Sequence, residues 1–370
     1  MIYLDYSATT KADPRVVDFF SEANSKYFAN PNSLHALGKR AKHAIERTSA
    51  LIAKTLGLDG YEIIFTSGAT EANNLAIKGV LERYADQKKR IIATYFEHAS
   101  IITPLGVMQK KGFTIDIVRH DKDGRVDLNH LRELMGDDVA LVSIGSVSAE
   151  IGIRQPVEAI AAIVEQHNCL FHCDATQSIG KEIIDLRGAD LITFSAHKFY
   201  GLKGVGVLAK KKDVPISTQI HGGSSTTSYR AGTPSTPLIL SLGKALSLAY
   251  KNHLHRSAKV QALNDYLRSR LERIPGLAIN TPSNGLPHIL NFSLIGISSR
   301  KTVLALSKKE IYISNHSACS SRARKSLVVL ALTGDEKRAS SSLRVSLSHL
   351  STKAEINKLV AALRQVRRGA

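Results

Sequence analysis

The chain has 370 residues, 43% of them hydrophobic, which can bury one large and one smaller core because single cores stop growing at about 250–300 residues. No apolar run reaches the roughly 18 residues that span a membrane, and residues 1–5 lack the features of a signal peptide, so we expect no membrane attachment and a cytoplasmic location. The formal net charge of +18 predicts a basic surface that attracts acidic proteins or nucleic acid.

Charge alone does not decide between these two kinds of partner. The sequence contains no nucleic-acid-binding motif, and only 6% of its residues are aromatic and able to stack on bases, which argues against direct nucleic-acid binding. The three cysteines are Cys169, Cys173 and Cys319, an odd and sparse number typical of a reducing compartment. A cysteine with a special role here is therefore expected to act as a thiol.

The first two thirds of the chain have the pattern of an α/β domain. Between about residues 62 and 210, short apolar runs rich in β-branched residues alternate with segments of helical spacing, such as 70–84 and 157–167. This alternation predicts a mostly parallel, seven-stranded sheet covered by helices. The predicted strands are residues 62–66, 90–94, 114–118, 139–144, 169–174, 190–195 and 204–209.

The pattern changes after residue 234. A long helix is predicted near 238–273, followed by strands at 288–294 and 343–347 and a helix at 353–364. We therefore expect a large domain of residues 15–235 and a smaller α+β domain made of residues 1–14 together with 236–370.

Two polar side chains follow adjacent strands of the predicted sheet. Lys198 lies in the segment SAHKFYGLKG at 195–204, where a strand ends and a glycine-rich turn begins, and a lysine at such a rim can form a Schiff base with an aldehyde cofactor. Asp174 ends the preceding strand at the same carboxyl edge, where a carboxylate can pair with a pyridinium nitrogen. A lone lysine is usually only a surface residue and a lone acid a helix cap, but the two together indicate a cofactor site.

Two further segments carry weaker signals for the same site. Residues 65–74, FTSGATEANN, form a strand, a turn of small residues and a helix start, whose N–H groups and hydroxyls can hold a phosphate. His98 follows the next strand, where an imidazole can stack on a cofactor or move protons, although a lone histidine there is more often structural.

A zinc site is the alternative reading of the strand at 169–174. Cys169 and Cys173 with His167 and His172 are residue types that bind zinc. A single strand cannot wrap them around one ion, because His172 points away from the side that the two cysteines share. We therefore expect no metal and interpret Cys169 and Cys173 as core thiols.

Together these segments resemble the cysteine desulfurases, within the class V aminotransferase group of pyridoxal-phosphate enzymes. The resemblance covers nearly the whole chain, because YLDYSATT at 3–10, NPNSLH at 30–35 and SSLRVSL at 341–347 keep the family's order and approximate spacing. It implies the fold of the aspartate-aminotransferase-like pyridoxal-phosphate-dependent transferases.

The resemblance also implies roles for individual residues. Lys198 would bind pyridoxal 5'-phosphate as a Schiff base, Asp174 would pair with the ring nitrogen, Gln177 would bond to the ring hydroxyl, and His98 would stack on the ring and take part in catalysis. One contact would come from a second subunit, so a homodimer is implied. The remaining cofactor contacts fall on Ala69, Thr70, Ser195, His197 and, from the second subunit, Thr233.

The implied reaction takes sulfur from L-cysteine and leaves L-alanine. Arg344 would grip the substrate carboxylate, which suits its planar fork, and Cys319, in the segment NHSACSS at 315–321, would receive the sulfur as a persulfide. A sulfur-acceptor protein, such as a scaffold for iron–sulfur cluster assembly or an enzyme of tRNA or cofactor thiolation, would then take it. The alternatives are a selenocysteine or cysteine-sulfinate lyase, an aminotransferase of the same group, or an impaired homologue that only binds partners.

Two departures from the family pattern bear on substrate binding and on subunit contacts. Ser148 and Ala149 stand where the family usually has two asparagines, and Ala149 cannot offer a side-chain hydrogen bond to the cofactor region or the substrate. We therefore expect weaker cysteine binding. The glutamate–arginine pair common before the segment that begins at Arg230 is also missing, so subunit contacts are expected to differ.

Overall fold

A computed structural model describes residues 1–223, 225, 227–315 and 325–369. Its larger part is a seven-stranded sheet of order β2-β8-β7-β6-β5-β3-β4, in which only β8 runs antiparallel to its neighbours, β2 and β7. All seven strands predicted from the sequence are confirmed, with bounds that differ by at most two residues. They are β2 (Tyr61–Thr66), β3 (Arg90–Ala93), β4 (Thr114–Ile117), β5 (Val139–Ser143), β6 (Leu170–Asp174), β7 (Leu191–Ser195) and β8 (Gly206–Lys211).

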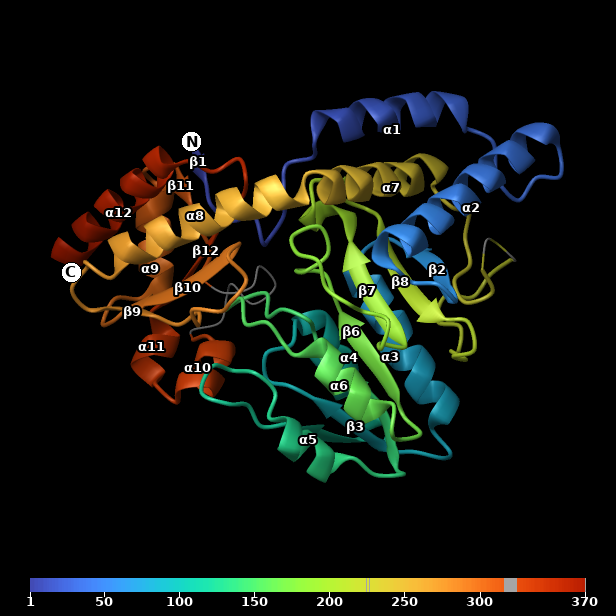
Figure 1. The fold of residues 1–370 in the computed structure, drawn as a ribbon, viewed down its shortest axis with the longest axis horizontal. Helices are drawn as coiled ribbons and strands as arrows, with labels where there is room; N and C mark the ends of the chain where they lie inside the picture. The colour runs from blue at the N-terminus through green and yellow to red at the C-terminus, as the bar shows by residue number, and fades with distance from the viewer. Residues whose placement is uncertain (224, 226, 316–324, 370) are drawn as a thin grey trace.

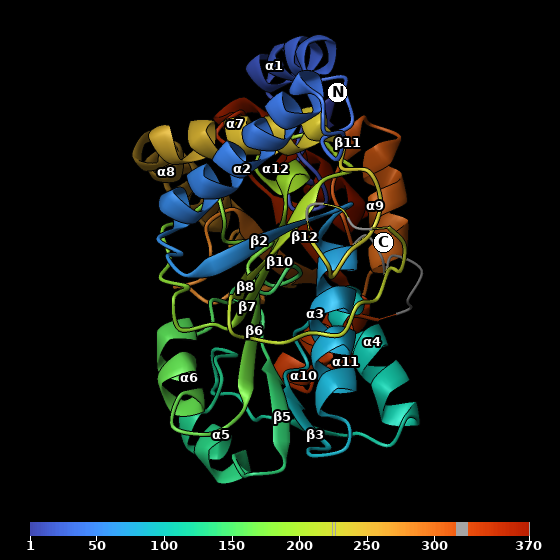
Figure 2. The ribbon, with the colours of Figure 1, turned by 90° about the vertical axis from the view of Figure 1, so that its right-hand side faces the viewer.

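Helices cover both faces of this sheet (Figure 2), which is why the central strands β5 and β7 are buried along their whole length. In β8, for example, Leu208 packs under α3 and α4, whereas Val207 and Ala209 face the core on the other side. The helices on the first face are α3 (Ala69–Tyr84) and α4 (Ala99–Lys110), and those on the second are α2 (Ala36–Leu56), α5 (Leu128–Leu134) and α6 (Val157–Val164).

One long helix was expected at 238–273, and this prediction is wrong. The chain forms α7 (Thr236–Lys251) and α8 (His253–Leu271), which are separated at Asn252. The apolar side of α7 packs against α1 (Pro14–Lys26) and α2, and so belongs to the larger core, while α8 belongs to the smaller one. The larger core therefore includes α7 and the smaller core includes α8.

The smaller unit lies to the left in Figure 1 and is built on the antiparallel sheet β12-β10-β9. The first residues of the chain join it, because β1 pairs in parallel with β11 and Leu4 is fully buried in the smaller core. Its strands are β1 (Ile2–Tyr3), β9 (Leu277–Ile279), β10 (Ile289–Leu294), β11 (Ile311–Tyr312) and β12 (Ser342–Ser346). Its other helices are α9 (Ser299–Ser307), α10 (Leu327–Thr333), α11 (Glu336–Ser340) and α12 (Lys353–Arg368).

Within the described part of the chain, no helix combines the length and apolar character needed to cross a membrane.

Candidate active site

A cavity of about 430 Å³ opens at the carboxyl ends of β5, β6 and β7 and is closed on one side by Arg344 from β12. Apart from Thr233, every predicted site residue in the described part of the chain lines it. Thr233 lies in a separate small hollow beside Ser67 and Gly204, and Cys319 lies outside the described residues. The predicted residues that line the cavity are Ala69, Thr70, His98, Asp174, Gln177, Ser195, His197, Lys198 and Arg344.

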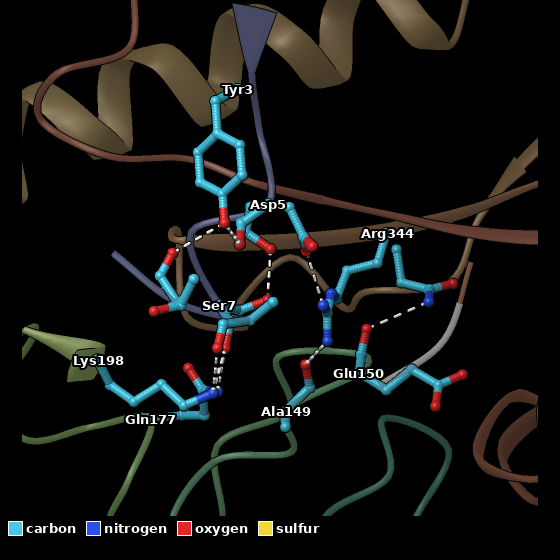
Figure 3. A network of polar contacts seen from close by, with 12 residues as sticks. Tyr3, Asp5, Ser7, Ala149, Glu150, Gln177, Lys198 and Arg344 are labelled. Atoms are coloured by element: carbon cyan, nitrogen blue, oxygen red, sulfur yellow. Dashed lines mark hydrogen bonds and ion pairs between the residues drawn. The ribbon is translucent and has the colours of Figure 1, made fainter. Parts of the chain in front are cut away.

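Lys198 is carried into the cavity by the short 3-10 helix η1 (Ala196–Lys198), which follows β7 directly. Its Nζ donates hydrogen bonds to the carbonyl oxygens of Ser7 and Ala8, at 2.7 and 2.9 Å (Figure 3). Gln177 donates to the same Ser7 carbonyl at 3.0 Å, and its Oε1 accepts a hydrogen bond from Lys181 at 2.5 Å. The segment after β1 therefore forms part of the wall around Lys198, which the sequence alone did not reveal.

Asp174 ends β6, and both of its carboxylate oxygens are bonded. Oδ1 accepts the backbone N–H of Thr176 at 2.9 Å, and Oδ2 accepts the side-chain amide of Asn73 at 2.9 Å. Asn73 was missed from the sequence. It could have been found from its position three residues after Thr70 on α3, because residues three apart lie on one face of a helix.

His98 is both a wall of the cavity and the N-cap of α4. Its Nδ1 accepts the backbone N–H of Ser100 at 3.1 Å, and the Ser100 hydroxyl lies 2.8 Å from the same nitrogen. Since a backbone N–H can only donate, the ring proton of the neutral histidine is on Nε2. Burial lowers the pKa of His98, against the opposing effect of Asp174, so the ring is neutral at pH 7.

Glu97 lies beside His98 and has an unusual protonation state. Its carboxyl accepts the hydroxyl of Thr94 at 2.7 Å and the backbone N–H of Gly145 at 3.0 Å. Burial, reinforced by the nearby charge of Asp174, raises the pKa of Glu97 to about 8. The carboxyl of Glu97 therefore keeps its proton at neutral pH.

The start of α3 provides an anion site at the other end of the cavity. Gly68 occupies the N-cap and has no side chain to bond the first N–H groups of the helix, which are thus available to a phosphate. Ser195 and His197 face this turn from the end of β7 and from η1. Burial and the charges of Lys198 and Lys203 lower the pKa of His197 to about 4, so it can donate a hydrogen bond there as a neutral ring.

Arg344 projects from β12 and is 1% exposed. Its Nη2 donates to Asp5 at 2.8 Å, and its Nη1 donates to the carbonyl of Ala149 at 2.9 Å (Figure 3). The backbone of Ala149 thus orients this arginine, although its side chain has no hydrogen-bonding group. The smaller and larger units meet at this contact.

The cavity also has unsatisfied hydrogen-bonding groups. In the described residues, five buried side-chain polar atoms have no partner, and three of them belong to residues that line this cavity: Ser148 Oγ, Thr176 Oγ1 and Arg344 Nε. Because buried polar groups are nearly always paired, their concentration here indicates a bound polar ligand. An ionisable lysine, a carboxylate on the next strand and a helix N-terminus fit the amine-reactive aldehyde, ring nitrogen and phosphate of pyridoxal phosphate.

Comparisons with known proteins agree with the family expected from the sequence. Residues 2–359 match the family described as Aminotransferase class-V. A protein named cysteine desulfurase IscS from Dictyoglomus turgidum is 36% identical over 99% of this chain and 94% of its own, and a mitochondrial cysteine desulfurase from Arabidopsis thaliana is 37% identical over 97% and 81%. This chain belongs to the cysteine desulfurase family. The expected family and enzyme class are thereby confirmed.

Solved structures confirm the expected fold of this cysteine desulfurase family member. A structure titled NifS-like protein has a TM-score of 0.92 at 33% identity and covers all of both chains. A structure titled SspA in complex with cysteine has a TM-score of 0.83 at 29% identity and covers 95% of this chain and all of its own. Members of this family depend on pyridoxal phosphate.

The residues considered for zinc have other partners in this desulfurase fold. His172 bonds through Nδ1 to Ser143 at 2.9 Å and through Nε2 to Thr193 at 3.1 Å. Burial raises the pKa of Cys169 to about 12 and that of Cys173 well above its usual range, so neither thiol ionises at neutral pH. Across the described ranges, no group of three or more His, Cys, Asp or Glu residues is arranged to hold a metal ion.

Proposed function

We propose that this chain binds pyridoxal phosphate in the cavity and uses it to take sulfur from L-cysteine, leaving L-alanine and a persulfide on Cys319. The observation that carries the proposal is the meeting of Lys198, Asp174 and Arg344 in one cavity, from two strand ends of the large sheet and one strand of the small sheet. These three provide an amine for the cofactor, a carboxylate for its ring nitrogen and a cation for the substrate carboxylate.

In this proposal the cofactor is held by residues at both ends of the cavity. Lys198 binds its aldehyde carbon, Asp174 its ring nitrogen and Gln177 its ring hydroxyl, while His98 lies against the ring. Once bound, the cofactor withdraws electrons and stabilises negative charge at the substrate Cα. Its phosphate is bound by the turn and side chains of Ala69, Thr70, Ser195 and His197, joined in a homodimer by Thr233 of the partner subunit.

The chain's own groups position the substrate and move its proton. Arg344, oriented by Asp5 and the carbonyl of Ala149, binds the carboxylate of cysteine. The amine of Lys198 would act as the base that takes the proton from the substrate Cα and returns it during the reaction. Cys319 attacks the substrate sulfur as a thiolate and keeps it as a persulfide, and the remaining three carbons leave as alanine.

The persulfide is then passed to a sulfur-acceptor protein. The net charge of +18 supports an acidic acceptor, since opposite charges speed the encounter of two proteins. An iron–sulfur scaffold and a tRNA sulfurtransferase are the two kinds of acceptor that we propose.

The test is an absorbance scan of the purified protein before and after cysteine is added, with alanine and sulfide measured in the presence and absence of dithiothreitol. We expect a visible cofactor band in the wild type, its absence in Lys198→Ala, and loss of alanine formation in Cys319→Ala. Cys169→Ser is the matched control and should keep wild-type alanine formation, because the raised pKa keeps that thiol protonated.

Other outcomes would point to the alternatives. Continued alanine formation by Cys319→Ala, with selenocysteine or cysteine sulfinate as substrate, would indicate a lyase of the same group. A wild-type protein without a visible band would mean that the cavity does not bind pyridoxal phosphate, and the proposal would be wrong.

A further inference from the structure

Asn73 is a fully buried amide on α3 that the proposed reaction does not use. Its Nδ2 donates one hydrogen bond to Asp174 Oδ2 at 2.9 Å and another to Ser100 Oγ at 2.8 Å. Ser100 in turn contacts Nδ1 of His98. One side chain therefore connects the carboxylate proposed for the cofactor nitrogen with the imidazole proposed for the ring face.

The hydrogens along this connection can point in only one direction. The backbone N–H of Ser100 makes Nδ1 of His98 an acceptor, so the Ser100 hydroxyl must donate to that nitrogen and accept from Asn73. From the other end, an ionised Asp174 can only accept, which requires Nδ2 of Asn73 to face it. Both ends fix the same orientation of the amide.

The acceptor side of the amide is fixed as well. Asn73 Oδ1 accepts a short hydrogen bond from the hydroxyl of Thr193. Thr193 then accepts from Nε2 of His172 at 3.1 Å, and Nδ1 of His172 accepts from Ser143 at 2.9 Å. Burial lowers the pKa of His172 to about 4, so this ring is neutral and has the single N–H that the arrangement needs. Both polar atoms of the Asn73 side chain thus have partners within the core, in three hydrogen bonds.

We infer that Asn73 is a positioning residue that holds Asp174 and His98 in one hydrogen-bonded unit, with Asp174 turned to accept from the cofactor and the N–H of His98 left on Nε2. The inference rests on the proposed function for its ligand, pyridoxal phosphate. It adds a residue that touches neither cofactor nor substrate but sets the orientation of two groups that do.

The experiment replaces the amide in two ways with opposite volume effects, Asn73→Ala and Asn73→Leu. Cofactor-free protein is titrated with pyridoxal phosphate and followed by the visible band, and the imidazole nitrogens of His98 are observed by ¹⁵N NMR with and without the cofactor. Both variants should bind pyridoxal phosphate roughly tenfold more weakly or worse, because each loses a hydrogen bond to a charged group. Both should also raise the pKa of His98, since the Ser100 hydroxyl becomes free to turn and accept from the ring.

Two further variants distinguish the hydrogen bond from Asn73 to Asp174 from the connection through Ser100 to His98. Ser100→Ala breaks only the His98 arm, so it should change the ¹⁵N shifts of His98 while its affinity for pyridoxal phosphate stays within about twofold of the wild type. Asn74→Ala is the matched control, because among the described residues that amide bonds to the backbone carbonyl of Thr70 within its own helix, and it should change neither reading. The charged groups that act on His98 are Asp174, Lys198 and Arg344, and no substitution removes them.

Wild-type affinity together with unchanged His98 shifts in folded Asn73→Ala and Asn73→Leu would overturn the inference. So would failure of both variants to fold, judged by circular dichroism, since Asn73 would then be structural. Failure of the proposed function has a different signature: wild-type protein would gain no band with pyridoxal phosphate, whereas Ser100→Ala would still change the ¹⁵N shifts of His98.

Discussion

The free energy of unfolding is expected to depend on pH through the carboxyl of Glu97. The pKa of its carboxyl rises from the ordinary value of 4.5 to about 8 in the folded protein. The folded state therefore holds a proton that the unfolded state has released, and stability present below pH 4.5 is lost as the pH rises through 8. Glu97→Gln keeps a neutral group and removes this loss.

We expect Glu97→Gln to match the wild type near pH 4.5 but to be more stable at pH 9, by roughly 2–4 kcal/mol, if the cofactor is absent from both. Urea unfolding at the two pH values measures the difference. Glu165→Gln, at an exposed position, should follow the wild type throughout. Equal pH dependence in Glu97→Gln and wild type would show that Glu97 ionises normally.

Individual residues of the site were predictable when the chemistry was contained in one short segment. Lys198 and Asp174 each follow a recognisable strand, so the sequence places both at one sheet edge, and the structure lines the cavity with both. Asn73 does not follow a strand and could not be found in this way, because its three side-chain partners lie 27, 101 and 120 residues away in the sequence. Lys181 was missed because a buried lysine has no sequence signature. Burial, together with the charges of Lys198 and Arg344, lowers its pKa well below the usual range.

At the scale of elements, the phosphate turn depends on the close approach of β8. A Cβ on Gly206 would lie 2.6 Å from the backbone of Gly68, whereas a Cβ on Gly106 in α4 would meet nothing within 4 Å. We expect Gly206→Ala to destabilise the protein by about 1–3 kcal/mol and to weaken retention of the cofactor, because the turn must move. Gly106→Ala should be neutral or stabilising by up to about 1 kcal/mol.

Thermal unfolding and the visible band after gel filtration measure both effects for the two glycine variants. The explanation fails if Gly206→Ala retains cofactor and stability as well as Gly106→Ala does.

The loop after β5 gives a prediction about substrate binding. Ala149 and Ser148 line the cavity, and Ser148 Oγ has no partner in the described part of the chain. An amide at 149 can add one hydrogen bond to the ligand, so we expect Ala149→Asn to lower the KM for cysteine about 2- to 10-fold. Ala149→Leu has similar volume without the amide and should not lower it. Steady-state alanine formation measures both, and a KM for Ala149→Asn at or above the wild-type value would contradict the prediction.

Elements were predictable where the hydrophobic pattern changes with the structure. The seven strands of the large sheet were found because buried strands are short, apolar and bounded by polar turns. The break between α7 and α8 was missed because helical spacing continues through Asn252, and only packing shows that the two helices belong to different cores. The contact of residues 7 and 8 with Lys198 likewise depends on tertiary structure, since 190 residues or more separate them.

At the scale of the whole molecule, the site is assembled from residues of both units that lie far apart in the sequence. Arg344 of the smaller unit bonds to Asp5 near the N-terminus and to Ala149 of the larger unit, and it is almost completely buried. Losing one partner of a buried charge is costly, because the remaining charge is left without compensation. The relative position of the two units is therefore coupled to the residue proposed to bind substrate.

The net charge of +18 belongs to the molecule as a whole and predicts how sulfur leaves it. Attraction between a basic enzyme and an acidic acceptor is screened over about 10 Å at 0.1 M salt. We expect transfer of labelled sulfur from cysteine to an acidic scaffold protein to slow by roughly tenfold between 50 and 500 mM salt. Alanine formation with dithiothreitol as the acceptor should change by less than about twofold, since a neutral thiol is not steered by charge. If salt slows both reactions equally, the basic surface acts on the catalytic step rather than on the encounter with the acceptor.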